Sequence, residues 1–272
     1  MNSSKRIVKI IADILALVLI VNIFSVAGTA LLAIVGISQI GESVENISDE
    51  MIYTTIGQDI SEIDLDIASA SVYIKSADSF TFSTNDKGFS VKQKKNKLKV
   101  EEKNLKAFSG IGEAVIVITV PQAVVLDLLE IESGAGALTV EGVACDKLEA
   151  DLGFGEVIFD EVNVNIKADI DSGAGNTKIT NSIFNNLSLS AGVGKTTVSA
   201  TMTGINEIES GIGNLHISNN TQITDYSVSI EPGLGKVKVG GEEVSEDSII
   251  GTGKNVIKIE GGIGNIEVDF AK

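Results

Sequence analysis

Beyond residue 128 the chain alternates apolar and polar residues, and a Gly-x-Gly triplet interrupts this alternation at regular intervals. In the first copy, apolar Ile131 precedes the triplet, and Leu138 and Val140 follow it with polar Thr139 between them. A period of two indicates a half-buried strand. Each copy is therefore predicted to be a strand, a glycine corner, a second strand and a return segment.

The triplets form a repeat of seven copies, whose first glycines are 19, 20, 19, 19, 22 and 29 residues apart. A repeat of this length marks units that bury a continuous core only when they stack. Because crossovers between parallel strands are right-handed, the predicted fold is all-β: a single-stranded, parallel, right-handed β-helix, or solenoid, with about 19–20 residues per coil. The predicted corners are Gly134, Gly136, Gly153, Gly155, Gly173, Gly175, Gly192, Gly194, Gly211, Gly213, Gly233, Gly235, Gly262 and Gly264.

The stretch from 57 to 128 is interpreted as the irregular beginning of the same domain, and the regular coils start near residue 129. It contains an alternating segment, Ile63–Lys75, in which Ala68 and Ala70 stand where the glycines would be. Residues 240–255 are expected to loop out of the last coil, which would account for the 29-residue spacing.

An uncharged run of 24 residues, Ile14–Ile37, follows the basic residues Lys5, Arg6 and Lys9. About 20 such residues cross a bilayer as a helix, and flanking cations stay on the cytoplasmic side. The run is therefore predicted to be one transmembrane helix, with the N-terminus in the cytoplasm and the following domain outside. A cleaved signal peptide is the alternative, although the run continues past Ala30 and exceeds the usual apolar region of a signal.

The predicted organisation is a basic cytoplasmic start and transmembrane anchor over residues 1–40, a spacer over 41–56 and the solenoid domain over 57–272. The chain carries a formal net charge of −16, and residues 41–272 carry −18 because the first 40 residues carry +2. Nucleic acid would repel so acidic a body. The expected partners are the lipid bilayer and an unknown envelope or protein partner.

The composition offers little catalytic chemistry. The 272 residues include one Cys, one His and no Trp, and Arg6 is the only arginine. The lone Cys145 has no cysteine to pair with, and no Cys/His cluster suits zinc. His216, at an outward strand position, is interpreted as a surface residue. The chain is predicted not to be an enzyme and to carry no cofactor.

One copy of the repeat, "GVGKTT" from Gly192, has the appearance of a phosphate-binding loop. That loop needs a glycine five residues before the Gly of Gly-Lys-Thr, and Leu189 stands there. The residues that follow, "TTVSATMTG", favour a strand, whereas the loop must open a helix. Nucleotide binding is therefore excluded.

A carboxylate stands two residues before the first glycine in six of the seven copies, and Asp66 is assigned the same place in the first coil. In stacked coils these side chains would form a like-charge row with neighbours about 5 Å apart, which is unfavourable without a counterion. Either the row is a solvated face, or it binds cations such as calcium or a basic ligand. The candidate metal-binding residues are Glu132, Asp151, Asp171, Glu209, Glu231 and Glu260, and the seventh copy has Ser190.

Asn176, Asn214 and Asn265 follow the second glycine in three copies. Asn side chains suit turn chemistry, so these residues are expected to hydrogen-bond the backbone of the corner.

The strand ending "ITVP", the segment "LDLLEIESGAGALTVEG" and the repeated "GIGN" resemble a bacterial family of putative-adhesin domains of unknown function, related to the head GIN domain. The resemblance covers residues 57–272. It implies a right-handed β-helix outside the cytoplasm, and some Gram-positive members of the family belong to envelope-stress gene sets. It supplies no catalytic residues.

Together these observations predict a non-catalytic, membrane-anchored, extracytoplasmic β-solenoid with an adhesin-like interaction role or a stress-associated role at the cell envelope. One alternative is a calcium-binding solenoid that uses the acidic row. Another is a β-helix enzyme that acts on polysaccharide.

Overall fold

The computed structural model describes residues 51–103, 114–244 and 248–271, which belong to one compact unit beginning at Met51. The predicted transmembrane anchor lies outside these residues. Within the described part of the chain, no helix is long and apolar enough to cross a membrane.

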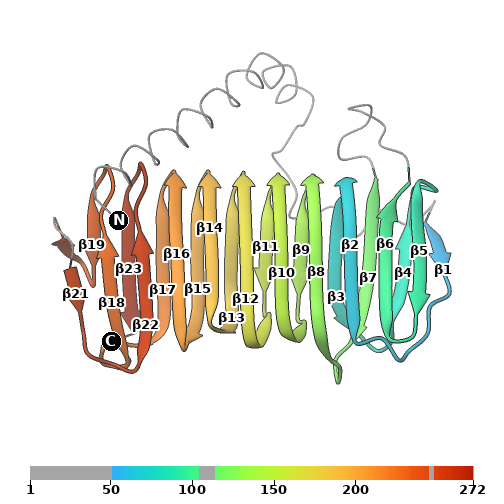
Figure 1. Ribbon diagram of the computed structural model, residues 1–272, viewed down its shortest axis with the longest axis horizontal. Coiled ribbons are helices and arrows are strands. Elements are labelled where there is room, and N and C mark those ends of the chain that lie inside the picture. The colour runs from blue at the N-terminus through green and yellow to red at the C-terminus, as the bar shows by residue number, and fades with distance from the viewer. Residues whose placement is uncertain (1–50, 104–113, 245–247, 272) are drawn as a thin grey trace, which may run out of the picture. The chain divides into compact units, whose positions relative to one another are not determined.

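The unit is all-β, and its strands lie side by side in two long ladders (Figure 1). In spatial order, ladder A consists of β5 (Phe89–Lys94), β6 (Lys97–Glu102), β2 (Glu62–Ser69), β8 (Val125–Ala135), β10 (Ala144–Phe154), β12 (Asn163–Ala174), β14 (Leu187–Val193), β16 (Ile205–Ile212), β22 (Asn255–Glu260), β18 (Tyr226–Glu231) and β21 (Ser248–Ile250).

Ladder B runs alongside in the corresponding order. It consists of β1 (Ile52–Thr54), β4 (Thr81–Thr84), β7 (Val115–Pro121), β3 (Ser71–Ala77), β9 (Leu138–Glu141), β11 (Val157–Asp160), β13 (Thr177–Asn185), β15 (Thr196–Thr203), β17 (Leu215–Gln222), β23 (Ile266–Ala271), β19 (Val237–Val239) and β20 (Glu242–Val244). A single-turn 3-10 helix, Ile223–Asp225, precedes β18.

The period-two alternation builds one core between the ladders. Leu138 and Val140 of β9 are buried, and so are Val157 and Phe159 of the next coil, while the residues between them are partly exposed. The buried apolar side chains of both ladders form a single cluster. Strands, corners and inward positions thus agree with the sequence-based prediction of a stacked all-β, solenoid-like fold.

The corners lie where the Gly-x-Gly triplets predict them. In all seven copies the second glycine has a φ between +134° and +151°. The first coil uses alanines instead: Ser69 pairs with Ala135, which places the Ala68–Ala70 corner beside the Gly134–Gly136 corner.

The coils from β8 and β9 to β16 and β17 stack in chain order, but those at the two ends do not. The last coil, β22 and β23, lies between β16/β17 and β18/β19 (Figure 1). At the other end, β2 and β3 lie between β6/β7 and β8/β9.

Two segments predicted to be irregular contribute edge strands. Residues 240–255, expected as a loop, contain β20 and β21, which pair antiparallel with β19 and β18 and terminate the two ladders. The predicted spacer, 41–56, ends within the fold, because β1 pairs antiparallel with β4. At both ends of the molecule, an antiparallel strand pairs with the last parallel strand of each ladder. Most of these edge strands are only three residues long, so little open edge remains for pairing with another chain.

Candidate functional site

The acidic residues predicted to form a row do lie in one register position of ladder A. The pairings confirm Asp66 in that row and extend it by Glu101 at the end near β6, and the six candidate metal-binding carboxylates are exposed. They also place Glu260 before Glu231, because the last coil is inserted. The full row is Glu101, Asp66, Glu132, Asp151, Asp171, Ser190, Glu209, Glu260 and Glu231.

A groove of about 640 Å³ follows this row across five coils, from the β2 coil to the β14 coil. Each coil contributes the acidic-row residue and the first corner residue, which is Ala68 in the β2 coil and Gly134, Gly153, Gly173 or Gly192 in the others. A side chain at these glycines would meet the backbone of the neighbouring coil, since a Cβ at Gly153 would lie 2.2 Å from the Gly134 carbonyl oxygen, so glycine lets the corners stack closely beneath the row of carboxylates. With strands about 4.8 Å apart, five coils give a groove about 19 Å long.

An apolar row borders the groove on its other side. The middle residues of the triplets pair in register through Phe154, Ala174 and Val193 of successive coils. Phe154 is 53% exposed, and Leu234, in the corresponding corner near the far end, is 71% exposed. We refer to the acidic row, the groove and the apolar row together as the corner surface. The sequence showed that these middle residues are apolar, but only the structure shows that some of them face solvent.

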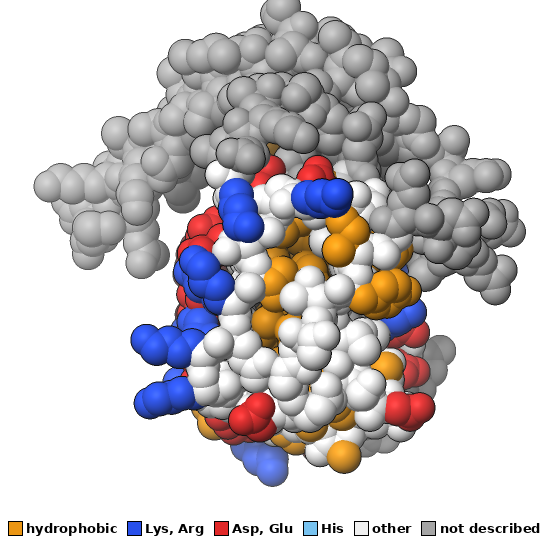
Figure 2. Space-filling view, turned by 90° about the vertical axis from the view of Figure 1, so that its right-hand side faces the viewer, with side chains coloured by type: hydrophobic (Ala, Val, Ile, Leu, Met, Phe, Trp, Pro, Cys, Tyr) orange, Lys and Arg blue, Asp and Glu red, His pale blue; other side chains and the backbone are white. Residues whose placement is uncertain are grey.

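The charges along the acidic row are unevenly compensated. At the β6 end, Lys92 and Lys99 form ion pairs with Glu101, both with N–O distances of 3.2 Å, and they lower the pKa of that carboxyl. Figure 2, which views the end where β5 and β1 lie, shows the lysine side chains gathered along one side. In the middle of the row, burial raises the pKa of Asp171, and the neighbouring charges of Asp151 and Asp169 add to that effect.

Replacing Asp171 with asparagine is expected to stabilise the protein slightly at pH 7. A carboxyl whose pKa is raised by folding favours the protonated state in the fold, so its ionisation destabilises the fold at any pH above its unfolded-state pKa. For an exposed group we expect no more than about 0.5 kcal/mol, or about 1 °C in Tm. The gain should decline as the pH falls through the unfolded-state pKa of about 3.9, and most of it should be lost at pH 3.5.

Thermal unfolding of Asp171→Asn at pH 7 and pH 3.5 checks this expectation. Asp78→Asn, an exposed aspartate outside the row, is the matched control and should leave Tm unchanged. A gain at pH 7 that persists at pH 3.5 would show that charge repulsion is not its cause.

The three corner asparagines act as predicted on the backbone. Asn176 Oδ1 accepts from the Lys195 backbone N–H at 3.3 Å, and Asn214 Oδ1 accepts from that of Asn265 at 3.0 Å. Asn265 Oδ1 in turn accepts from the Lys236 backbone N–H at 3.1 Å. Each side chain links its own corner to that of the next coil, so these asparagines hold the corners in register.

Cys145 is not available as a nucleophile. It is fully buried in β10. Burial, with a smaller contribution from the charge of Asp146, raises the pKa of its thiol to about 12. The reactive species of cysteine is the thiolate, so this thiol is inert at neutral pH.

A family model described as Toastrack DUF4097 matches residues 60–243. Among solved structures, the chain is similar to a putative adhesin from Bacteroides fragilis NCTC 9343, with 13% identity, a TM-score of 0.49 and coverage of 80% of this chain and 95% of that chain. It is also similar to a putative cell adhesion protein from Clostridium sporogenes ATCC 15579, with 14% identity, a TM-score of 0.33 and coverage of 81% and 99%. A search of curated proteins finds no match.

Proposed function

Since the chain belongs to the Toastrack DUF4097 family, we propose that it is a non-catalytic, adhesin-like interaction protein of a bacterial cell envelope. The proposal includes an N-terminal helix in the lipid bilayer, a cytoplasmic N-terminus and the solenoid outside. The uncharged run Ile14–Ile37, preceded by Lys5, Arg6 and Lys9, supports this topology. The parallel pairing of coil upon coil supports a right-handed parallel β-helix as the fold.

The observation that carries this function is the corner surface. Its carboxylates stand in register on adjacent strands, so each lies close to like charges, and a cationic ligand would relieve that repulsion. The groove is about 19 Å long, which matches about six residues of an extended peptide at about 3.3 Å each. The exposed Phe154 beside the groove, with the partly exposed Ala174 and Val193, offers contact to non-polar parts of the same ligand. The preferred partner is therefore an extended, basic chain segment.

Calcium is the second candidate ligand. Glu132, Asp151 and Asp171 occupy consecutive coils, so their oxygens can approach a common ion, and carboxylate oxygens are the ligands that calcium prefers. A calcium ion would use two or three neighbouring coils, whereas a basic peptide would use the length of the groove. This difference separates the two candidates.

The test is thermal unfolding of the full-length protein in detergent with hexalysine, CaCl2 or MgCl2, each compared with NaCl at the same ionic strength. A ligand that binds only the folded state raises Tm by mass action. At about 100 times its Kd, hexalysine is expected to raise Tm by about 5 °C over the NaCl reference. Glu132→Gln/Asp151→Asn should remove that gain. The control Asp78→Asn/Glu161→Gln loses the same charge outside the acidic row and should retain the gain.

Stabilisation by calcium that magnesium and hexalysine do not reproduce would replace the basic ligand with the second candidate. If hexalysine and the three salts act alike at matched ionic strength, the acidic row is a screened surface and the proposed binding role of the groove is wrong.

A further inference from the structure

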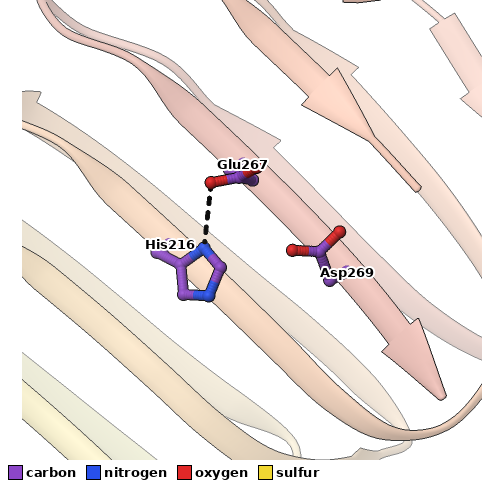
Figure 3. A group of neighbouring side chains, drawn as sticks. All are labelled: His216, Glu267 and Asp269. Carbon is purple, nitrogen blue, oxygen red and sulfur yellow. Dashed lines mark ion pairs between the residues drawn. The ribbon is translucent and has the colours of Figure 1, made fainter. Parts of the chain in front are cut away.

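The only histidine of the chain lies beside two carboxylates on the outer face of ladder B (Figure 3). His216 of β17 is paired in register with Glu267 of β23, and the distance from His216 Nδ1 to Glu267 Oε2 is 3.4 Å. Asp269 is two residues further along β23 and therefore on the same face. One ligand atom from each of the three side chains lies within 4.8 Å of the other two.

The inserted last coil creates this group. In chain order the coil after β17 is the one with β19, which would place Lys238 beside His216. In the structure β23 lies between them, so His216 faces Glu267 and Lys238 lies on the far side of that carboxylate. On its other side His216 pairs with Thr197 of β15, which carries no charge. The imidazole therefore has carboxylates on the β23 side and an uncharged residue on the β15 side, and no cation of the described strands is paired with it in register.

The spacing fits a shared metal ion better than a direct hydrogen bond. A good N–H···O bond measures about 2.7–3.2 Å, shorter than the 3.4 Å between His216 and Glu267. For metal–ligand distances of about 2.0–2.2 Å, two ligands of a tetrahedral ion lie about 3.4 Å apart. The two pairs that involve Asp269 lie within 4.8 Å, and rotation of the exposed Glu267 and partly exposed Asp269 side chains can bring them to that distance.

We propose that His216, Glu267 and Asp269 bind a divalent transition-metal ion, with Zn²⁺ as the expected ion. Imidazole nitrogen with two carboxylate oxygens is a ligand set suited to zinc, and water would complete the tetrahedron at this exposed face. Calcium and magnesium prefer all-oxygen sites, so they should bind here weakly. The site is separate from the corner surface, because its residues belong to ladder B and the acidic row belongs to ladder A.

The experiment is a calorimetric titration of the full-length protein, prepared without a histidine tag, with ZnCl2, MgCl2 and CaCl2. NMR of the imidazole protons accompanies it, because the single histidine makes their assignment unambiguous. Zinc is expected to bind at one ion per chain and to shift the His216 signals, while magnesium and calcium leave those signals in place. Loss of a ligand in Glu267→Gln or Asp269→Asn should weaken zinc binding by at least about tenfold, since loss of even an outer-shell partner costs that much.

Glu141→Gln is the matched control. Glu141 is exposed in the same outer row of ladder B as Asp269, but it lies in β9, several coils away, and its loss should leave zinc binding unchanged. His216→Ala removes any imidazole contribution and sets the background. If Glu267→Gln and Asp269→Asn bind zinc as the unaltered protein does, the histidine binds alone and the three-residue site is wrong. If zinc leaves the NMR signals of His216 unchanged, the proposed three-residue site is also wrong.

Discussion

Alanine at Gly175 is expected to lower the free energy of unfolding by about 3 kcal/mol or more, the largest effect among the single substitutions considered. The Cβ of this alanine would lie 1.7 Å from the carbonyl oxygen of Gly155 in the neighbouring coil, and Gly175 has a φ of +145°. The backbone conformation costs about 1–3 kcal/mol for a residue with a side chain, and overpacking adds about 1–3 kcal/mol. The obstacle is backbone, so no side chain can rotate to relieve the clash.

Gly240→Ala is the control that separates these two contributions. Gly240 has a φ of +58°, but an added Cβ would meet nothing within 4 Å. Only the cost of the left-handed conformation remains, about 1–2 kcal/mol. Denaturant unfolding of both variants measures the difference. Equal losses at the two positions would show that backbone conformation, and not the close approach of stacked corners, makes glycine necessary at Gly175.

Leucine at Asn206 is expected to destabilise the protein by about 3 kcal/mol, because it leaves the buried Leu187 backbone N–H without its hydrogen bond and removes two further, partly buried ones. Asn206 is fully buried at the start of β16. Its Oδ1 accepts from the Leu187 backbone N–H at 3.0 Å, and its Nδ2 donates to the Val256 carbonyl at 3.0 Å and to the Thr203 carbonyl at 3.3 Å. One side chain thus joins β14, β15 and the inserted β22.

Asn176→Leu provides the comparison. Asn176 is exposed and accepts one hydrogen bond, from the Lys195 backbone N–H at 3.3 Å, so its loss should cost less than about 1 kcal/mol. Denaturant unfolding again gives both values. A loss at Asn206 no larger than that at Asn176 would mean that the buried amide does not hold the inserted coil in place.

The strands, the corners and the acidic row could be predicted from the sequence because each depends on contacts that every coil repeats. Inward residues such as Ile131 and Val140 are buried in every arrangement that stacks the coils, so a period of two is sufficient to find them. The near-constant spacing of the triplets places Glu132, Asp151 and Asp171 in register. The Ala68–Ala70 corner was identified for the same reason, by its position in the alternation.

The order of the coils could not be predicted, because all coils present similar strand edges and similar inward faces. Nothing in an alternating pattern says which coil is the neighbour of which. Two further Gly-x-Gly triplets fall outside the seven copies: Gly110–Gly112, within residues 104–113 that the structure does not describe, and Gly251–Gly253, between β21 and β22.

By itself, then, the sequence determined the repeating unit: two strands, a glycine corner and a row of exposed carboxylates, all set by local side-chain alternation. Only the tertiary structure decided which coils lie next to each other. The segment with β20 and β21 returns the chain far enough for its last coil to enter between two earlier ones, where Asn206 binds Val256. That insertion places Glu267, and not Lys238, beside His216. The proposed metal site therefore depends on which of several similar strand edges pair with each other. This pairing is set by contacts between residues far apart in the sequence, so a local pattern of side chains does not predict it.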